Sequence, residues 1–438
     1  MTDDKDRVVP LFSFGDTEKR QRIDCAVLAG LSARALPREE NADEQTMAEL
    51  EALLETAGGT CAATVLQKRD APDPRTFFGE GKTAELRLTV ENTGADLVVV
   101  DNELSPSQMR VLTELLGVRV MDRSGLILDI FAQRARTREG RLQVELAQYQ
   151  YLLPRLTGMW GHLVRQTASG GRSPIGTRGP GETQLETDRR HIRRKIAKLR
   201  EELEDVRRVR GTQRERRIKN ELPVVALVGY TNAGKSTLLN ALTGAGIPAN
   251  DRLFDTLDTT TRTLELSDTC TVLLSDTVGF IHKLPHLLVE AFKATLEELT
   301  YADVLLHVID GSNPDWPDQA RVVERLIGEL GAAQKPRIDV FNKSDLAGGD
   351  IKPHGESIVS ISARTGEGLD ELRAALSRLL DTGLRRVTLR LPYDKAGLLD
   401  LLYREAKVES VSYEDTIIVT AVCPPKLLGQ AGDYLWNS

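Results

Sequence analysis

The sequence predicts an α/β chain with a small parallel α/β domain, a long antiparallel helical hairpin, a P-loop domain and a small α+β C-terminal domain. Three observations carry this prediction. Apolar runs alternate with helical stretches in the first part of the chain. Two amphipathic segments with matching periodicity follow, and a G-x-x-x-x-G-K-S motif then stands between an apolar run and a helix. A length of 438 residues leaves room for roughly three domains.

The composition is typical of a cytoplasmic protein. The cysteines stand far apart and form no CxxC pair, so we expect neither a disulfide framework nor a zinc site. Residues 1–21 read as a flexible tail that is too polar for a signal peptide. No apolar run reaches the ~18 residues of a membrane-spanning helix, so we expect no stable membrane insertion and leave only peripheral association open.

Residues 22–123 are expected to form a small parallel sheet covered by helices. Four apolar runs alternate with three helical stretches, which is a β-α-β-α-β-α-β order. The runs are Ile23–Leu31, Cys61–Leu66, Ala95–Val100 and Val118–Met121, and the helices lie near Glu44–Thr56, Lys82–Asn92 and Ser107–Leu116. Within this domain FFGEGK (Phe77–Lys82) either binds an anion or is an ordinary turn into the next helix. The motif is short, so we favour the turn.

Residues 124–221 are expected to form the helical hairpin. Leu142, Leu146, Tyr149, Leu153 and Leu156 are spaced by alternating fours and threes, and so are Ile192, Ile196, Leu199, Leu203 and Val206. Each set therefore makes one apolar stripe with the seam period of a coiled coil. Pro154 is predicted to interrupt and kink the first helix. The alternative is two surface helices that pack on other domains.

The hairpin segment is strongly basic within an acidic chain. The whole chain carries −7, whereas residues 132–220 contain 22 basic and 10 acidic residues, a net charge of +12. The helices are joined by a Gly-rich stretch, Gln166–Gln184, that is either disordered or orders on an RNA surface. The basic residues predicted to contact RNA phosphates are Arg172 and Arg178 in this stretch and Arg189, Arg190, Arg193 and Arg194 after it.

Residues 222–382 are expected to form a P-loop domain. Val224–Val228 is a short buried-strand signal, and the phosphate-binding loop follows it, with a helix starting near Thr237. Glycines let the loop amides point at phosphate oxygens, while Lys235 should reach the β- and γ-phosphates and Ser236 should hold Mg²⁺. The loop residues predicted to bind nucleotide are Gly229, Tyr230, Thr231, Asn232, Ala233, Gly234, Lys235 and Ser236.

Two later stretches have the character of nucleotide switches. Leu253–Arg262 is rich in threonine, which suits a segment that senses the γ-phosphate. The apolar run Cys270–Leu274 leads into Asp276-Thr277-Val278-Gly279, which suits a magnesium-side carboxylate and a γ-phosphate contact from the Gly279 amide.

The base is predicted from two further strand ends. Arg337–Phe341 leads into Asn342-Lys343-Ser344-Asp345, and Ser357–Ile361 leads into Ser362-Ala363-Arg364. A carboxylate at Asp345 can accept from both N1–H and the amine of guanine, and adenine offers no such pair of donors. The four motifs in order favour GTP over ATP.

Residues 383–438 are expected to form a compact α+β unit without a catalytic constellation. VTLRLPY reads as a strand, Lys395–Ala406 as an amphipathic helix, Glu414–Val422 as a second strand and Pro425–Leu435 as a helix.

Three strings together resemble the HflX family of bacterial translational GTPases. They are RSPIGTRGPGETQLE (Arg172–Glu186), GYTNAGKSTLLN and DTVGFIHKLP, and the first is the most specific because other GTPases lack it. The resemblance extends from about Arg22 to the C-terminus. It implies GTP hydrolysis, binding to the large ribosomal subunit, and splitting or rescue of ribosomes under stress, with the hairpin carrying its loop toward the peptidyl-transferase centre.

By position the resemblance also implies residue roles. Ser236 and Thr256 would hold Mg²⁺, with Asp276 behind them, and Lys235, Thr256 and Gly279 would serve catalysis. Asp255 and Thr259 stand where the family leads us to expect alanine and proline, which leaves the resting switch conformation open. The first switch would contact nucleotide through Phe254, Asp255, Thr256, Leu257 and Asp258, the second through Asp276, Thr277, Val278 and Gly279, and guanine would be held by Asn342–Asp345 and Ser362–Arg364.

Two positions bear on the mechanism. Phe280 stands where Ras-like GTPases have a water-orienting glutamine, so intrinsic hydrolysis should be slow and should depend on groups from elsewhere, naturally the ribosome. Asn232 matches an asparagine that holds K⁺ in related GTPases, and loop shaping is the alternative role. We expect a monomer that binds GTP or GDP and no DNA. The alternative function is a non-ribosomal GTP-dependent switch that regulates a protein complex.

Overall fold

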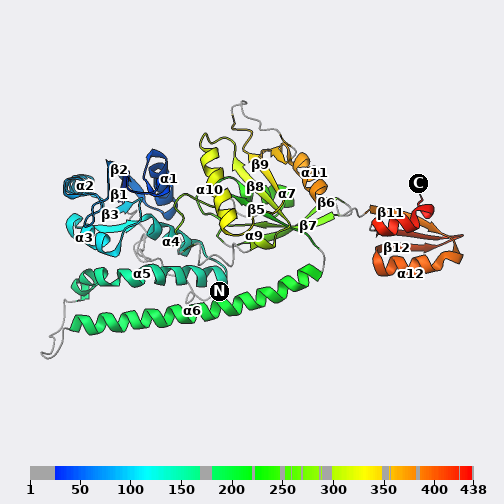
Figure 1. Ribbon diagram of the computed structural model, residues 1–438, viewed down its shortest axis with the longest axis horizontal. Coiled ribbons are helices and arrows are strands. Elements are labelled where there is room, and N and C mark those ends of the chain that lie inside the picture. The colour runs from blue at the N-terminus through cyan, green and yellow to red at the C-terminus, as the bar shows by residue number, and fades with distance from the viewer. Residues whose placement is uncertain are drawn as a thin grey trace.

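The computed structural model describes residues 25–167, 180–219, 222–246, 252–257, 259–267, 270–285, 288, 298–347, 355, 357–380, 385–423 and 425–436. They form a mixed α/β chain with one parallel sheet, one mostly parallel sheet, a pair of long helices and a separate antiparallel sheet (Figure 1). The predicted tail, residues 1–21, lies outside the described residues.

The first sheet is parallel, in the order β2-β1-β3-β4. The predicted order of its elements is confirmed: β1 (Cys25–Ala33), α1 (Glu44–Ala57), β2 (Thr60–Arg69), α2 (Glu80–Thr93), β3 (Leu97–Val100), α3 (Pro106–Leu116) and β4 (Arg119–Asp122). Capping boxes begin α1 at Asp43 and α3 at Ser105. At FFGEGK, the Arg69 guanidinium donates to the Phe78 carbonyl at 2.7 Å just before α2, which favours the turn.

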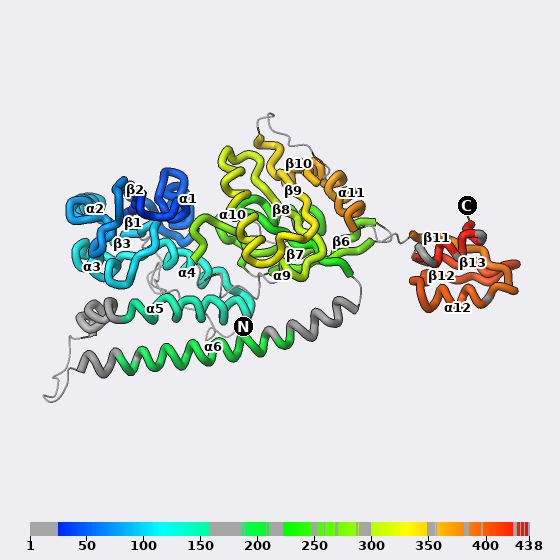
Figure 2. The backbone as a smooth tube through the Cα atoms, viewed as in Figure 1, coloured from blue at the N-terminus to red at the C-terminus, as the bar shows by residue number. Residues whose placement is uncertain are grey.

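Helix α4 (Arg123–Arg134) packs on α1, and its apolar side chains belong to the core of the first sheet. This packing favours a domain boundary near Arg134 over the predicted one at Arg123. The hairpin helices α5 (Arg138–Thr167) and α6 (Pro180–Lys219) run side by side, with α5 between α6 and the first sheet (Figure 2).

The predicted hairpin seam is confirmed. The two stripes form one cluster that contains Leu142, Leu146, Ile192, Ile196, Leu199 and Leu203, with Tyr149, Leu153, Leu156 and Val206 packed against it. Helix α5 continues through Pro154, so the predicted interruption is wrong. The flanking Tyr151 and Arg155 tie this turn to Asp122 of β4, at 2.8 and 3.1 Å, which supports the helix there. The connection is shorter than predicted, because α5 extends to Thr167 and α6 begins at Pro180.

The second sheet has the order β10-β9-β8-β5-β7-β6, with β6 antiparallel to β7. Its elements are β5 (Val224–Gly229), α7 (Lys235–Thr243), β6 (Thr260–Ser267), β7 (Cys270–Asp276), α9 (Glu298–Tyr301), β8 (Val304–Asp310), α10 (Trp316–Glu329), β9 (Arg337–Asn342), β10 (Ile358–Ser360) and α11 (Leu369–Leu379). The carboxyl ends of the parallel strands β5, β7, β8 and β9 meet at one edge, which is where ligands of such sheets bind.

The C-terminal sheet has the order β11-β13-β12 and its own core. Its elements are β11 (Arg385–Leu391), α12 (Ala396–Glu405), β12 (Lys407–Tyr413), β13 (Ile417–Cys423) and α13 (Pro425–Ala431). Among the helices of the described ranges, none combines the length and apolar character needed to cross a membrane.

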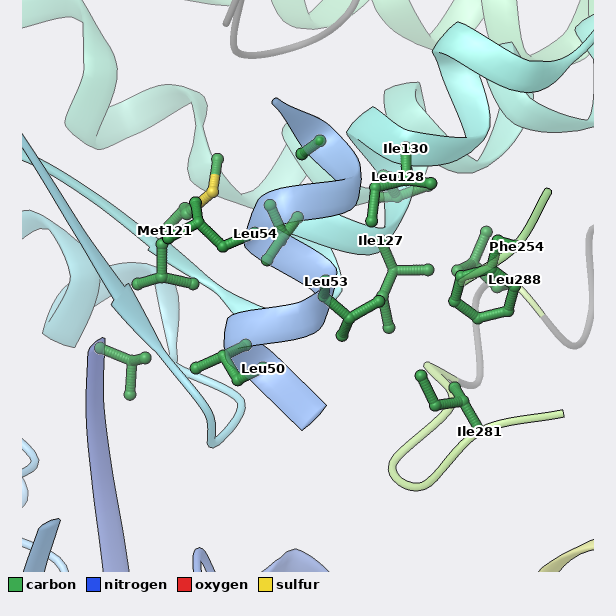
Figure 3. Packing of buried hydrophobic residues seen from close by; sticks show 14 of the residues in the cluster. Leu50, Leu53, Leu54, Met121, Ile127, Leu128, Ile130, Phe254, Ile281 and Leu288 are labelled. Carbon is green, nitrogen blue, oxygen red and sulfur yellow. The ribbon is translucent and has the colours of Figure 1, made fainter. Parts of the chain in front are cut away.

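The core of the first sheet continues into the P-loop domain. Phe254, Ile281 and Leu288 face the side of the first domain where α1 and α4 carry Leu53 and Ile127 (Figure 3). Phe254 belongs to the first predicted switch, Ile281 lies two positions after the second, and Leu288 lies further along the same stretch. The first domain therefore contacts the first predicted switch and the stretch that follows the second.

Candidate functional site

The P-loop joins β5 to α7 at the carboxyl edge of the second sheet. Gly234 has a φ of 91°, and a Cβ there would lie 2.2 Å from the Asn342 amide nitrogen, so only glycine fits. The loop therefore passes directly beside the predicted base motif. A pocket opens between this loop and the first switch, lined by Thr231, Asn232, Gly234, Lys235, Ser236, Thr237, Arg252, Phe254, Asp255, Thr256, Thr277 and Gly279.

Lys235 lies buried at the start of α7. Its ammonium donates to the carbonyls of Gly229 and Tyr230 at 3.2 and 2.8 Å, which holds it inside the loop. Burial lowers the pKa of Lys235 to about 8, although the nearby Asp276 carboxylate favours the charged form. A phosphate in the pocket would add negative charge beside this ammonium and keep it protonated.

The oxygen atoms predicted to surround magnesium converge. The Ser236 hydroxyl lies 2.7 Å from the Thr256 hydroxyl and donates to the Asp276 carboxylate at 2.6 Å. Burial raises the pKa of Asp276, and its second oxygen, Oδ1, has no hydrogen-bond partner. A hard cation prefers such oxygen ligands, and it would offset the cost of burying that carboxylate. These residues therefore fit Mg²⁺.

Most ligands of such a cation would have to come from the nucleotide and water. Among the described residues, no group of three or more His, Cys, Asp or Glu side chains could hold a metal ion alone. A magnesium ion bound through one or two protein oxygens and substrate phosphates matches this arrangement.

The second switch approaches the P-loop closely. A Cβ at Gly279 would lie 2.8 Å from the Thr231 Cα and 3.0 Å from the Lys235 ammonium, which explains the glycine. The next residue, Phe280, exchanges backbone hydrogen bonds with the loop. Its amide donates to the Gly229 carbonyl at 3.1 Å, and its carbonyl accepts from the Thr231 amide at 2.7 Å.

The Phe280 side chain is 1% exposed and belongs to the core shared with the first domain. We therefore expect Phe280→Gln to raise intrinsic hydrolysis by no more than about threefold, because a glutamine there would lack a pocket to orient it. Single-turnover hydrolysis without ribosomes measures this, and Phe280→Leu is the matched control for lost aromatic packing. A tenfold rise would contradict the expectation.

The two base motifs form one hydrogen-bonded unit. The Asn342 side chain donates to the Ala233 carbonyl and accepts from the Ala363 amide, both at 2.9 Å. The Ser362 hydroxyl donates to the Asp345 carboxylate at 2.8 Å. Asn342 thus links the P-loop to both motifs, and Asp345 is held in position beside them.

Two predicted residues take other positions. Arg364 is exposed in a turn, whereas Thr277 lines the pocket while its buried hydroxyl donates to the Leu227 carbonyl at 2.6 Å. Asp258, Arg172 and Arg178 lie outside the described residues.

The sequence argument missed two partners of the site. Asp310, at the end of β8, pairs with Lys343 at 2.7 Å, where Lys343 has a φ of 64°. The position of Asp310 at the end of a predicted strand was the sequence feature that could have identified it. Arg134 pairs with Asp255 of the first switch at 3.2 Å, and no local motif points to that contact.

Comparisons with known proteins cover most of the chain. Four family models match: the N-terminal region of GTP-binding GTPases over residues 44–132, their middle region over 134–217, the 50S ribosome-binding GTPase over 224–343, and the HflX C-terminal domain over 352–422. A "GTPase HflX" of Caldanaerobacter subterraneus is 51% identical over 85% of this chain and 86% of its own length. One from Escherichia coli is 45% identical over 86% and 88%, respectively. A GTP-binding protein of Sulfolobus solfataricus, solved with GDP, covers 82% of this chain and 98% of its own, with 23% identity and a TM-score of 0.42.

Proposed function

Because this chain belongs to the HflX family of GTPases, we propose that it binds the large ribosomal subunit and splits or rescues stalled or idle ribosomes under stress. In this proposal GTP hydrolysis times its release. One observation supports it above the others: a nucleotide site and a long basic hairpin are parts of one chain, and both pack on the same first domain.

The nucleotide chemistry follows from the site. Loop amides from Gly229 to Ser236 would hold the phosphates, and Lys235 would pair with the β- and γ-phosphates. The Ser236 and Thr256 hydroxyls would hold Mg²⁺, which would supply positive charge that neutralises the phosphates. The Gly279 amide would donate to the γ-phosphate, and Asn342–Asp345 with Ser362–Arg364 would bind guanine.

The attacking water must be oriented by a group that is not part of the second switch. The buried Phe280 ring has no hydrogen-bonding atom, so we propose that the ribosome supplies the group or the conformation that speeds hydrolysis. Asn232 has a φ of 61°, which asparagine adopts more readily than most residues, so loop shaping is a sufficient reason for it. A K⁺ ion at Asn232 is the alternative.

The second hairpin helix presents a basic surface away from the seam. Arg190, Arg193 and Arg194 are exposed and Arg189 is partly exposed, while Ile192 and Ile196 of the same helix face α5. Among the described residues, Arg193 pairs with Glu186 at 4.0 Å, in an exposed ion pair that contributes little to stability. Such a surface is suited to rRNA phosphates.

We expect the fourfold variant with Arg189, Arg190, Arg193 and Arg194 changed to glutamine to bind large subunits with a weaker salt dependence. Each lost phosphate contact should reduce the slope of log affinity against log salt by ~0.7, or about 3 in total. Equilibrium binding across a salt series measures the slope. The matched control changes four exposed arginines elsewhere, Arg87, Arg110, Arg321 and Arg386. If the first variant kept the wild-type slope, those four arginines would form only a solvated face of the helix.

The competing function is a non-ribosomal GTP-dependent switch that regulates a protein complex, in the cytoplasm or at a membrane surface. The net charge of +12 over residues 132–220 argues against it, because a protein partner would not need so much positive charge. Co-sedimentation with purified large subunits, in the presence of a non-hydrolysable GTP analogue, separates the two functions. We expect the protein to act as a cytoplasmic monomer and to pellet with the large subunits. A protein that stays in the supernatant would favour the non-ribosomal switch.

A further inference from the structure

The C-terminal end of α4, on the first domain, lies against the first switch. The rings of Phe131 and Phe254 meet edge to face, with centroids 4.8 Å apart, and both are almost fully buried. In the close view, Phe254 lies to the right of Ile127 and Ile130 of α4 (Figure 3). The first switch is therefore packed into the core of another domain.

An ion pair stands beside this aromatic contact. The Arg134 guanidinium lies 3.2 Å from the Asp255 carboxylate, and the two side chains are only 21% and 13% exposed. Asp255 occupies the position where the family resemblance leads to alanine. Phe131, Arg134, Phe254 and Asp255 together are called the switch clasp below.

The clasp is directly connected to the nucleotide site. The Phe254 amide donates to the Thr231 hydroxyl of the P-loop at 3.0 Å. The residue after Asp255 is Thr256, whose hydroxyl lies 2.7 Å from that of Ser236. Three consecutive switch residues therefore lie between α4 on one side and the P-loop on the other.

The switch backbone needs support to hold this position. Phe254 has a φ of 53°, a left-handed conformation that is costly for a bulky residue and persists only where its surroundings enforce it. Burial of its ring against Phe131 provides that support.

The clasp is carried by a helix that is itself anchored. At the other end of α4, Arg123 is 2% exposed and pairs with Asp101 at 2.7 Å and with Glu49. The same two carboxylates bond to the P-loop domain, Asp101 to Lys283 and Glu49 to the Tyr230 hydroxyl. This buried cluster holds α4 in place beside the P-loop and the second switch.

We propose that Phe131 and Arg134 are positioning residues that hold the first switch closed on the P-loop, so that the first domain raises the affinity for GTP relative to GDP. This inference rests on the proposed GTP binding. Thr256 can contact the magnesium and γ-phosphate side of GTP only when the switch is closed. GDP has no γ-phosphate, so this contact cannot strengthen its binding. A contact that favours the closed switch therefore strengthens GTP binding and leaves GDP binding unchanged.

The test compares Arg134→Gln and Asp255→Asn with the charge swap Arg134→Asp/Asp255→Arg. Affinities for GDP and a non-hydrolysable GTP analogue are measured by titration in Mg²⁺ on the full chain. We expect each single variant to bind the analogue about fivefold to tenfold more weakly, the scale of one partly buried ion pair. For Arg134→Gln, which changes a residue outside the nucleotide pocket, GDP affinity should stay within about twofold. The swap should regain most of the loss. Arg138→Gln is the matched control, because that side chain is 79% exposed and pairs with Glu202 of α6.

Two results would overturn the inference. An equal loss of affinity for both nucleotides would mean that Arg134 supports the fold without acting on the switch. Unchanged affinities for both nucleotides would mean that the ion pair has no effect. Both leave the proposed function standing, because the wild-type chain still binds GTP in either case. A wild-type chain that binds neither nucleotide would overturn the proposed function and the inference together.

Discussion

Asp345→Asn should bind GTP about a hundredfold to a thousandfold more weakly than the unchanged chain. The carboxylate can accept from two donors of guanine, N1–H and the exocyclic amine. An amide offers one acceptor and one donor, and its donor would face the guanine amine. The Ser362 hydroxyl, which holds Asp345 at 2.8 Å, can bond to the asparagine oxygen as well, so the new side chain should keep its place.

The same variant should bind xanthosine triphosphate more tightly than the unchanged chain does. Xanthine has a carbonyl where guanine has its amine, so the amide matches both base atoms. Titrations with the two nucleotides measure this change of preference. Asp370→Asn is the control, because it makes the same charge change at an exposed position of the same domain. An unchanged GTP affinity would rule out this base pocket, and weakened binding of both bases would indicate a distorted one.

The elements predicted best from the sequence were those in which the apolar spacing alone identifies the buried side. The alternating spacing from Leu142 to Leu156 and from Ile192 to Val206 was enough to identify the seam, because each stripe is buried by the other. The buried parallel strands β3, β5 and β8 were equally clear as short apolar runs.

Two edge strands escaped prediction. β6 reads TTRTLELS and β12 reads KVESVSY, and both are mostly polar with many exposed positions. An edge strand is buried on little of its surface, so its residues need not be apolar, and charged residues there also discourage edge pairing. The pattern that identifies a central strand is weak at such positions.

The nucleotide site was predictable where short motifs specify backbone shape, as at Gly234 and Gly279. Its connections to the first domain were not. Arg134 and Asp255, or Glu49 and Tyr230, come together only through packing of two domains. A charged residue in a sequence resembles any solvated one until its partner is known, so no local signal could have identified these pairs.

The second large effect concerns the hairpin tip. Deleting residues 170–181 should abolish subunit splitting and leave GTP affinity and intrinsic hydrolysis unchanged. None of the deleted residues is among those predicted to bind nucleotide or to form the hairpin seam. Helix α5 ends at Thr167 and α6 begins at Pro180, so the deletion removes most of the connection and only the first two residues of α6. A few remaining residues suffice to join two antiparallel helices.

Splitting should be lost because the tip is the part of the hairpin that would reach the peptidyl-transferase centre and collide with what occupies it. Ribosome-stimulated hydrolysis should fall only in part, since the basic face of α6 and the nucleotide domain keep their contacts. Light scattering of 70S particles measures splitting, and phosphate release measures hydrolysis in the same sample. A Gly/Ser stretch of equal length in place of residues 170–181 is the control, because it separates loop length from residue identity. If the deletion variant split ribosomes as well as the intact chain, the working end would lie elsewhere, and the basic helix would be the next candidate.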